Sequence, residues 1–191
     1  PRRPLRRNRL QLAAAAVAWQ LGVSNEAIAH ALENFAGIGR RFNQLAKLAL
    51  PGGGHAILVD DYGHHPKELA AVFDAARGGW AEHRLVVAFQ PHRYSRTRDL
   101  FDEFAAVLSG VDALVLTEVY PAGEAPITGA DSKALARSIR TRGRGDPVVV
   151  GSASELPDAL SSLLRDGDLL LVMGAGDIGQ VSQLLARDGL K

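Results

Sequence analysis

The fold is decided by a stretch that runs Ala56–Val59 (AILV) and continues as Asp60–Glu68 (DDYGHHPKE). The apolar run predicts a buried strand. Pro66 predicts the start of a helix, because proline is favoured in the first helical turn. Between them lie carboxylates, a phenol and two imidazoles. A turn between a strand and a helix is where open α/β sheets bind ligands. The stretch therefore predicts an α/β fold with a candidate site at this turn.

Short apolar runs and helix-length segments alternate along the rest of the chain. The expected strands are residues 42–50, 56–59, 85–89, 113–117, 147–150 and 169–173. The expected later helices are residues 67–77, 98–108, 132–140, 155–164 and 177–187. This alternation is typical of a mostly parallel sheet. Residues 51–54 are too short for a crossover, so the first two strands should form an antiparallel edge hairpin. We predict a Rossmann-like, mostly parallel six-stranded sheet with helices on both faces.

A small helical segment is expected before the sheet. Residues 10–21 and 25–35 predict two helices, with Gly22 ending the first and Ser24 capping the second. We place residues 1–41 at the helical end of a preceding domain and residues 42–191 in the sheet domain. Residues 1–9 hold five arginines and two prolines, and we interpret them as a frayed, altered or foreign end. Because the chain opens on proline, we expect it to be a piece of a longer protein.

Composition limits the class of protein. The chain has 191 residues, of which 47% are hydrophobic and 23% charged, and its net charge is +1. This balance is typical of a globular domain, and it gives no overall field that favours nucleic acid. Cysteine is absent, which excludes a disulfide framework and a thiolate metal site. No apolar stretch reaches 18 residues, so we expect no transmembrane helix. The absence of cysteine fits a reducing compartment, and the expected location is the cytoplasm.

Four segments with chemically active side chains follow expected strands: residues 60–68, 90–98, 118–129 and 174–179. The carboxyl ends of parallel strands share one edge, so these segments should converge. Residues 90–98 (QPHRYSRTR) hold three arginines and a histidine, which suit carboxylate or phosphate oxygens. The alternative is a solvated basic turn in which Thr97 caps the next helix. Glu118 and Glu124 could orient an amine or a metal, but for them the default interpretation is a solvated loop.

Residues 174–179 (GAGDIG) match the pattern G-x-G-x-x-G, but the acidic residue and the strand that should follow a dinucleotide fingerprint are absent. The glycines are better explained by close backbone approach or by helix-to-strand packing. A zinc site formed by Asp61, His64 and His65 is only weakly indicated, and we predict no metal ligands in this chain. No G-x-x-x-x-G-K-[ST] loop occurs, so any loop that cradles ATP phosphates lies outside this chain.

These segments resemble a known family. The runs at 60–66, 90–98, 118–124 and 174–179 are similar to the C-terminal domain of the Mur ligases, and among them to the UDP-N-acetylmuramate–L-alanine ligases. Residues 39–42 (GRRF) and the helices before them resemble the end of the central ATPase domain. The resemblance runs from about residue 10 to the C-terminus. It implies an ATP- and Mg²⁺-dependent ligase that makes peptidoglycan precursors, with Mg²⁺ bound mainly by the central domain.

The resemblance also implies roles for residues on the nucleotide side. Arg41 would reach the nucleotide phosphates, and Asp61 would bind the ATP ribose or orient the nucleotide. Asn8 would match the first asparagine of a His-Asn-x-x-Asn pattern at the adenine. Arg7 and Gln11 depart from that pattern.

On the amino-acid side, the resemblance implies a set of residues around L-alanine. Tyr62 and His64 would line the cleft, and the alanine carboxylate would bind to His92, Arg93 and Arg96. Ala175 would approach the alanine methyl group, where a small contact disfavours larger substrates.

The implied partners are UDP-N-acetylmuramate, L-alanine and two missing domains, with no nucleic acid or membrane. The chain alone is expected to be inactive. The alternatives are a Rossmann-like nucleotide or nucleic-acid binding module that uses Arg93, Arg96 and the N-terminal arginines, a dinucleotide oxidoreductase, and the related murein tripeptide recycling ligase.

Overall fold

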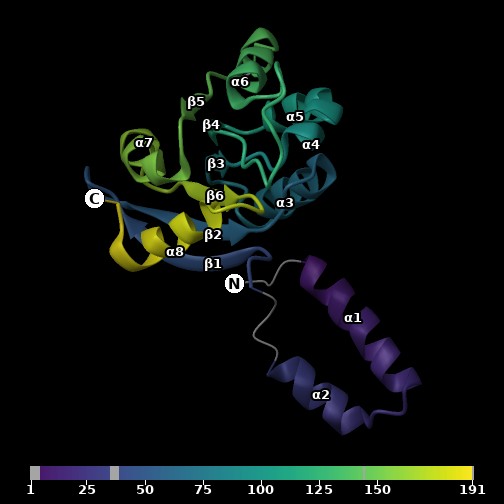
Figure 1. Ribbon diagram of the computed structural model, residues 1–191. Helices are drawn as coiled ribbons and strands as arrows, with labels where there is room; N and C mark the ends of the chain where they lie inside the picture. The colour runs from purple at the N-terminus through teal and green to yellow at the C-terminus, as the bar shows by residue number, and fades with distance from the viewer. Residues whose placement is uncertain (1–4, 35–38, 144, 191) are drawn as a thin grey trace. The chain divides into compact units, whose positions relative to one another are not determined.

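The computed structural model describes residues 5–34, 39–143 and 145–190 (Figure 1). The chain divides into two compact units, residues 1–39 and residues 40–191, and each is described by itself. The division falls two residues before the expected boundary, so Arg40 and Arg41 belong with the sheet. In the described parts of the chain, no helix is long and apolar enough to cross a membrane.

The first unit is a helical pair formed by α1 (Leu5–Gln20) and α2 (Asn25–Glu33). The Ser24 hydroxyl caps α2 by accepting the backbone N–H of Ala27 at 3.2 Å. Gly22 follows α1 with a φ of +81°, a backbone conformation that favours glycine. Both expected helix signals are therefore confirmed, although α1 begins five residues earlier than predicted. Among its described residues, the unit leaves five large apolar side chains exposed: Leu12, Val17, Trp19, Leu21 and Val23.

The second unit is built on a six-stranded sheet with the order β1-β2-β6-β3-β4-β5 (Figure 1). Its strands are β1 (Asn43–Ala49), β2 (His55–Asp61), β3 (Leu85–Phe89), β4 (Ala113–Thr117), β5 (Val148–Val150) and β6 (Leu169–Met173). β1 pairs antiparallel with β2, and the remaining neighbours are parallel. The predicted mixed sheet with an antiparallel edge hairpin is confirmed. The strand that comes last in the chain, β6, lies between β2 and β3.

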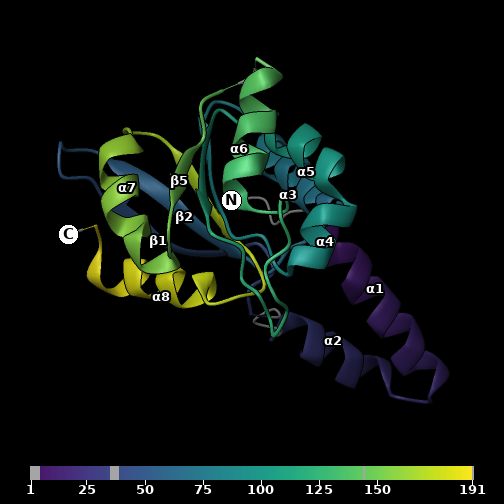
Figure 2. The ribbon, with the colours of Figure 1, turned by 45° about the horizontal axis from the view of Figure 1, so that its top comes forward.

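Helices cover both faces of the sheet, as predicted. They are α3 (Pro66–Gly79), α4 (Tyr94–Asp99), α5 (Phe101–Leu108), α6 (Ser132–Thr141), η1 (Ala153–Glu155), α7 (Leu156–Leu163) and α8 (Ile178–Asp188). Figure 2 shows α7 and α8 on one side of the sheet and α3, α5 and α6 on the other.

The single helix expected over residues 98–108 is wrong. The structure has two helices there, α4 and α5, which are separated by Leu100 with a φ of −116°. The chain bends because α4 buries Tyr94 and Thr97, whereas α5 buries Phe104 and Leu108 against the sheet. Arg98 therefore lies near the end of a helix rather than at the start of one.

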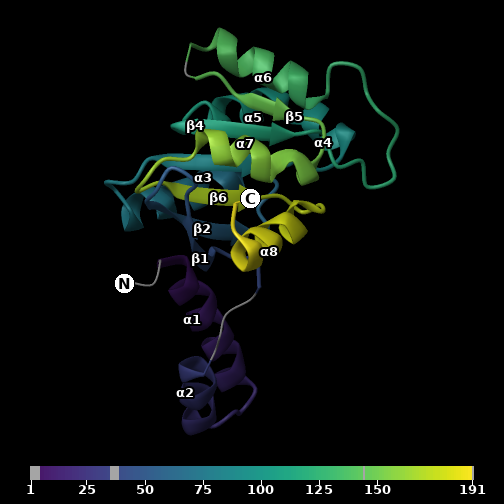
Figure 3. The same cartoon turned by 90° about the vertical axis from the view of Figure 1, so that its left-hand side faces the viewer.

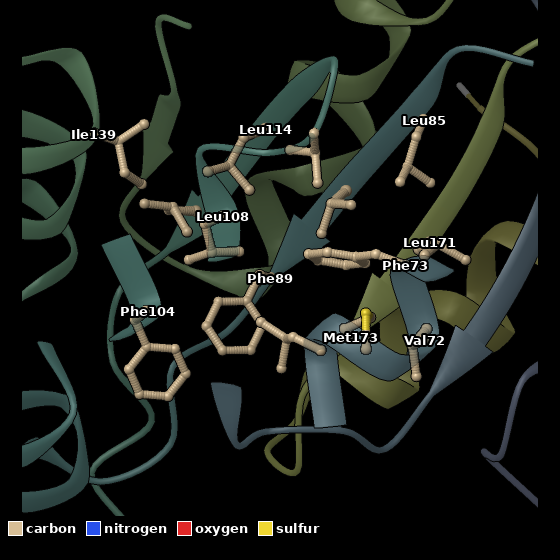
Figure 4. Close-up of a cluster of buried hydrophobic side chains, with 14 of the residues drawn as sticks. Val72, Phe73, Leu85, Phe89, Phe104, Leu108, Leu114, Ile139, Leu171 and Met173 are labelled. Atoms are coloured by element: carbon tan, nitrogen blue, oxygen red, sulfur yellow. The ribbon is translucent and has the colours of Figure 1, made fainter. Parts of the chain in front are cut away.

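The core has two layers because successive strand residues face opposite sides of the sheet. In β3, Val87 and Phe89 face α3 and α5, whereas Val86 and Ala88 face α7 and α8. Figure 4 shows Phe89 among the buried side chains of the first layer. Burying such a side chain stabilises the fold by about 2 kcal/mol. These packed layers fix the carboxyl ends of the central strands, where the polar segments begin.

Candidate active site

The four polar segments meet at the carboxyl edge of the sheet through backbone hydrogen bonds. The N–H of Gly174 donates to the carbonyl of Asp61 at 3.3 Å, and the N–H of Gln90 donates to Met173 at 3.0 Å. Tyr120 closes the set, because its N–H donates to the carbonyl of Pro91 at 2.8 Å. The expected convergence of the segments is therefore present in the structure.

The strand β2 runs through both aspartates, so they do not lie in the turn. Asp61 is 4% exposed. Its Oδ2 accepts the N–H of Phe42 at 2.7 Å, and its Oδ1 accepts the N–H of Gly63 at 2.7 Å. Burial raises the pKa of Asp61, and these two hydrogen bonds offset part of that rise. Asp61 thus ties the segment that carries Arg41 to the turn that carries Tyr62.

Arg40 binds the other aspartate, Asp60, and was not predicted as a site residue. Its Nε lies 3.1 Å from Asp60 Oδ2, and its Nη2 donates to the carbonyl of Gly174 at 2.6 Å. Asp60 is fully buried, and burial raises the pKa of its carboxyl group against the opposing effect of the guanidinium. A Cβ on Gly179 would lie 2.3 Å from the Arg40 guanidinium carbon, so this glycine makes room for the arginine. The adjacent arginine pair was a signal, but only Arg41 was assigned a role.

Of the residues expected on the nucleotide side, Arg41 and Asp61 lie at the same edge of the sheet. Arg41 is exposed, and its guanidinium lies 5.8 Å from the centre of the Tyr62 ring. Arg40 and Phe42, on either side of it, have φ values of 57° and 49°, which are rare for residues with side chains. Asn8 lies on α1 in the helical unit, and its side chain is outside the described part of the structure.

On the amino-acid side, four rings form a row along the edge: Tyr62, His64, His92 and Tyr120. Successive ring centres are 5.4, 5.6 and 5.4 Å apart. His92 and Tyr120 are stacked with an angle of 12° between their planes. The structure thus brings together three predicted residues and adds Tyr120, whose position just after β4 was the available signal.

Hydrogen bonds fix the two histidines of this row. His64 Nδ1 lies 3.1 Å from the carbonyl oxygen of Tyr62. Arg96 Nη1 lies 3.3 Å from His92 Nδ1 and donates to the His92 carbonyl at 3.1 Å. Burial lowers the pKa of His92, and the charges of His64 and the neighbouring arginines lower it further. His92 therefore stays neutral over a wider pH range than a free histidine.

Arg93 precedes α4 with a φ of 73°, a strained conformation for a non-glycine residue. Its guanidinium is half exposed and lies 3.7 Å from Glu124, in the long loop between β4 and α6 (Figure 3). Glu124 also accepts the N–H and the hydroxyl of Ser95, at 2.9 and 2.7 Å. These hydrogen bonds hold the pKa of Glu124 below its usual range. The expectation of a merely solvated Glu124 is therefore wrong.

The alternative in which Thr97 caps the next helix is also wrong. The side chain is buried inside α4, and its hydroxyl donates to the carbonyl of Arg93 at 2.9 Å. This bond helps to hold the strained residue in place. Glu118 is not simply solvated either, because its Oε1 accepts the N–H of Val119 at 2.8 Å and that of Ser132 at 3.4 Å.

The glycine-rich segment makes room for its neighbours. A Cβ on Gly176 would lie 2.3 Å from Gln90 Oε1 and 2.7 Å from the Tyr120 ring. Gln90 in turn donates to Asp177 Oδ1 at 2.6 Å. Close packing accounts for the glycines without a dinucleotide. Ala175, between them, is partly exposed at the same edge.

The described side chains form no cluster of metal ligands at this edge of the sheet. Over residues 5–34, 39–143 and 145–190, no group of three His, Asp or Glu side chains could hold one. The weakly indicated zinc site fails because His65 Nδ1 instead accepts the N–H of Lys67 at 3.3 Å, as the N-cap of α3. The residues present do not fit a Mg²⁺ or Zn²⁺ site, and no chemical step is assigned to a metal held by this chain.

A match to a family model shows which protein family the chain belongs to. The family model described as "Mur ligase, glutamate ligase domain" matches residues 40–176. The chain belongs to this family. The matched residues run from Arg40 into the glycine-rich segment, so they include most of the candidate active site.

Two relatives that cover most of this Mur ligase domain carry the same name. The chain is 69% identical over 180 residues to the UDP-N-acetylmuramate–L-alanine ligase of Stenotrophomonas maltophilia strain K279a, which covers 94% of the chain. It is 70% identical over 178 residues, 93% of the chain, to the ligase of the same name from Xanthomonas campestris pv. campestris strain B100. The chain spans 38% and 37% of the lengths of these relatives.

Solved structures agree on the Mur ligase fold. The UDP-N-acetylmuramate–alanine ligase of Thermotoga maritima matches with a TM-score of 0.73 and 27% identity, over 97% of this chain and 38% of that one. A murein peptide ligase from Psychrobacter arcticus matches with a TM-score of 0.64 over 98% of this chain and 37% of that one. Its identity of 22% supports the fold alone.

Proposed function

We propose that this chain is the C-terminal part of an ATP-dependent ligase that joins L-alanine to UDP-N-acetylmuramate in peptidoglycan precursor synthesis. The observation that carries the proposal is the cluster of Arg93, Arg96 and His92 beside the Tyr62–His64 turn. Relatives at about 70% identity bear the name of this activity. Because the chain spans only 38% of such a relative, the activity belongs to the whole enzyme.

In the proposed reaction, the carboxylate of the UDP-muramoyl substrate is phosphorylated by ATP. The amino group of L-alanine then attacks the acyl phosphate, and an amide and inorganic phosphate are released. The residues of this chain bind and orient the amino acid. Holding two reactants in a productive geometry supplies much of the rate of such a reaction.

The cationic turn is suited to the alanine carboxylate. Arg93 is half exposed, and Arg96 contacts His92, which lies four residues earlier in the chain. Hydrogen bonds between a guanidinium and a carboxylate contribute about 1.5–3 kcal/mol each. Arg98 does not share this role, because it is exposed and paired with Asp99 at 2.8 Å.

The nucleotide side is proposed to use Arg41, Asp61 and Asn8. Arg41 is exposed beside Tyr62 and can reach phosphate oxygens. Asp61 orients this side by fixing the backbone of Phe42 and Gly63. ATP and Mg²⁺ would be bound mainly by the preceding part of the enzyme, because this chain has no phosphate-cradling loop sequence.

Ala175 is proposed to face the alanine methyl group. The adjacent Gly176 is packed against Gln90 and Tyr120, so this segment cannot easily retreat from a larger substrate. A misfit of one methylene group in such a contact is worth about 1–3 kcal/mol.

The proposed partners are UDP-N-acetylmuramate, L-alanine and the preceding domains of the same enzyme. The exposed apolar side chains of α1, among them Trp19, fit burial against that preceding part. The proposed location is the cytoplasm, where ATP and UDP-sugars are available. No nucleic acid or membrane partner is proposed. The net charge of +1 provides no strong electrostatic attraction to either of them.

The test uses a full-length ligase made by joining this chain to the preceding part of the Stenotrophomonas maltophilia relative. We expect phosphate release that requires both UDP-N-acetylmuramate and L-alanine, and no turnover by the 191-residue chain alone. A preference for a tripeptide over alanine would instead indicate the recycling ligase. Turnover by the chain alone would contradict the proposed division of labour.

A variant tests the nucleotide side of the same enzyme. Asp61→Asn keeps one oxygen acceptor but loses the second, so the segment that carries Arg41 should shift. We expect a higher KM for ATP with a smaller change in the KM for alanine. The opposite pattern would place Asp61 with the amino acid.

A further inference from the structure

The amino acid in the proposed reaction must lose a proton before it can attack, and this inference rests on that proposed function. At neutral pH the amino group of alanine is an ammonium ion, which has no lone pair for the new bond. A nearby base is therefore needed. His64 and His92 are the candidates, with ring centres 5.6 Å apart. Which ring nitrogen carries the proton decides what each histidine can do.

His92 has its proton on Nε2. A guanidinium N–H can only donate a hydrogen bond, so the contact of 3.3 Å between Arg96 Nη1 and His92 Nδ1 makes that nitrogen an acceptor. The same Nη1 also donates to the His92 carbonyl, which holds the arginine in place. His92 therefore offers an N–H from Nε2. Taking up a proton at Nδ1 would break its bond to Arg96.

His64 has the opposite arrangement. A carbonyl oxygen can only accept, so the contact of 3.1 Å between His64 Nδ1 and the Tyr62 carbonyl places the proton on Nδ1. The lone pair is then on Nε2, which makes no hydrogen bond to any described residue. Two neighbouring rings thus offer complementary groups, a lone pair from His64 and an N–H from His92.

A carboxylate from the neighbouring helix lies beside His64. Glu68, from α3, lies 3.7 Å from Nδ1 and accepts the backbone N–H of His64 at 2.9 Å. The hydrogen bonds from His64 and His65 lower the pKa of Glu68 despite its partial burial, so the carboxylate stays ionised. The other titratable groups beside the ring are His92 and Tyr62.

We propose that His64 takes the proton from the ammonium group of the bound amino acid, while His92 donates a hydrogen bond to the substrate carboxylate. One N–H bond of the ammonium breaks and leaves its electron pair on nitrogen. The lone pair of Nε2 forms the new N–H bond, and Glu68 balances the imidazolium charge. The freed amine attacks the acyl carbon, phosphate leaves with the electrons of the C–O bond, and a second nitrogen proton departs with it.

The kinetic test is His64→Asn in the full-length ligase. The asparagine amide can replace the Nδ1–H that bonds to the Tyr62 carbonyl, but it places no atom at Nε2. We expect kcat/KM for alanine to fall about 10²–10³-fold at pH 7. It should then rise about tenfold per pH unit toward pH 9, because only free amine reacts. The KM for ATP should not change.

The matched control is His65→Asn. This neighbouring histidine caps α3, and asparagine is a good N-cap, so rate and pH profile should stay as in the wild type. If the ligase is active and His64→Asn keeps the wild-type pH profile, the proton-transfer role is wrong while the proposed function stands. If the wild-type ligase makes no alanine product, the proposed function itself fails.

A second measurement does not depend on activity. Long-range ¹H–¹⁵N correlation spectra of the 191-residue chain distinguish the two tautomers of each neutral histidine. We expect the proton of His64 on Nδ1 and that of His92 on Nε2. A proton on Nε2 of His64 would overturn the inference, because that nitrogen would then have no lone pair to offer.

Discussion

The end of β2 and the turn after β3 both place charged side chains at the carboxyl edge of the sheet, but their contacts differ. Asp60 and Asp61 are buried, and they accept hydrogen bonds from Arg40, Phe42 and Gly63 of the same chain. Arg93, after β3, is half exposed, and its ion pair with Glu124 is long at 3.7 Å. The first region is satisfied internally, whereas the second keeps donors for a ligand.

A dense run of charged residues can therefore have either of two roles, a structural one or a ligand-binding one. At the end of β2 the carboxylates form a framework that fixes two loops. After β3 the guanidinium group of Arg93 remains half exposed, with only a long ion pair to Glu124. The variants below test whether these two regions are as distinct as the contacts indicate.

The largest effect is expected for Arg93→Glu in the full-length ligase. The new carboxylate would repel both the alanine carboxylate and Glu124, so kcat/KM for alanine should fall about 10³-fold or more. The KM for ATP should stay near that of the wild type. Arg98→Glu is the control, because it makes the same charge change at an exposed position on α4. Equal losses in the two variants would mean that only the overall charge of the turn matters.

The second effect is a loss of stability in Arg40→Met. This change leaves the buried Asp60 carboxylate without its guanidinium partner, and such losses are about 3 kcal/mol. Urea unfolding of the 191-residue chain measures it. The double variant Arg40→Met/Asp60→Asn should recover part of the loss. If Arg40→Met costs no more than an exposed ion pair, about 1 kcal/mol or less, the framework role of Arg40 is wrong.

The third effect is expected for Gly176→Ala, which places a methyl group against Gln90 and Tyr120. Overpacking of this kind costs about 1–3 kcal/mol, and the KM for alanine should rise because Ala175 is displaced. Gly78→Ala, near the end of α3, is the control, since a Cβ there meets no atom within 4 Å. An unchanged KM for alanine in Gly176→Ala would separate this segment from the amino-acid site.

The smallest effect concerns pH and the two kinds of carboxylate. The folded pKa of Glu124 lies below its ordinary value of 4.5, so its contribution to stability is present above pH 4.5 and is lost as the pH falls. The folded pKa of Asp61 lies above 3.8, so its contribution is present below pH 3.8 and is lost as the pH rises through the folded pKa.

Urea unfolding between pH 3 and pH 6 tests these opposite signs. Glu124→Gln should weaken the loss of stability that the wild type shows on acidification below pH 4.5. Asp61→Asn should remove a contribution to the free energy of unfolding that falls with rising pH. The slope of this free energy against pH should therefore change in the direction opposite to that in Glu124→Gln. Slopes that change in the same direction would show that the two regions do not differ in this respect.

The sheet could be predicted from the sequence because its strands are short, continuous apolar runs between polar turns. The central strands 85–89, 113–117 and 169–173 were placed at their observed bounds. The break between α4 and α5 could not be predicted. It depends on which residues pack against the sheet, and periodicity over residues 98–108 does not carry that information.

The candidate site was predicted only as far as motifs at strand ends allow. Tyr62, His64 and His92 lie together, as the convergence of the segments implied. Arg40 and Glu124 were missed because their importance comes from partners 20 to 134 positions away in the chain. Likewise, the φ of 73° at Arg93 has no signature in its residue type.

The central position of β6 has a consequence for how the domain is made. During synthesis, β1 and β2 emerge early and β3, β4 and β5 follow, yet β2 and β3 have no common neighbour until β6 appears. Until then, each half exposes an unpaired strand edge rich in valine and leucine, which is prone to aggregation. The two halves can therefore join only after translation has passed residue 173. A nascent chain that stalls earlier should need a chaperone.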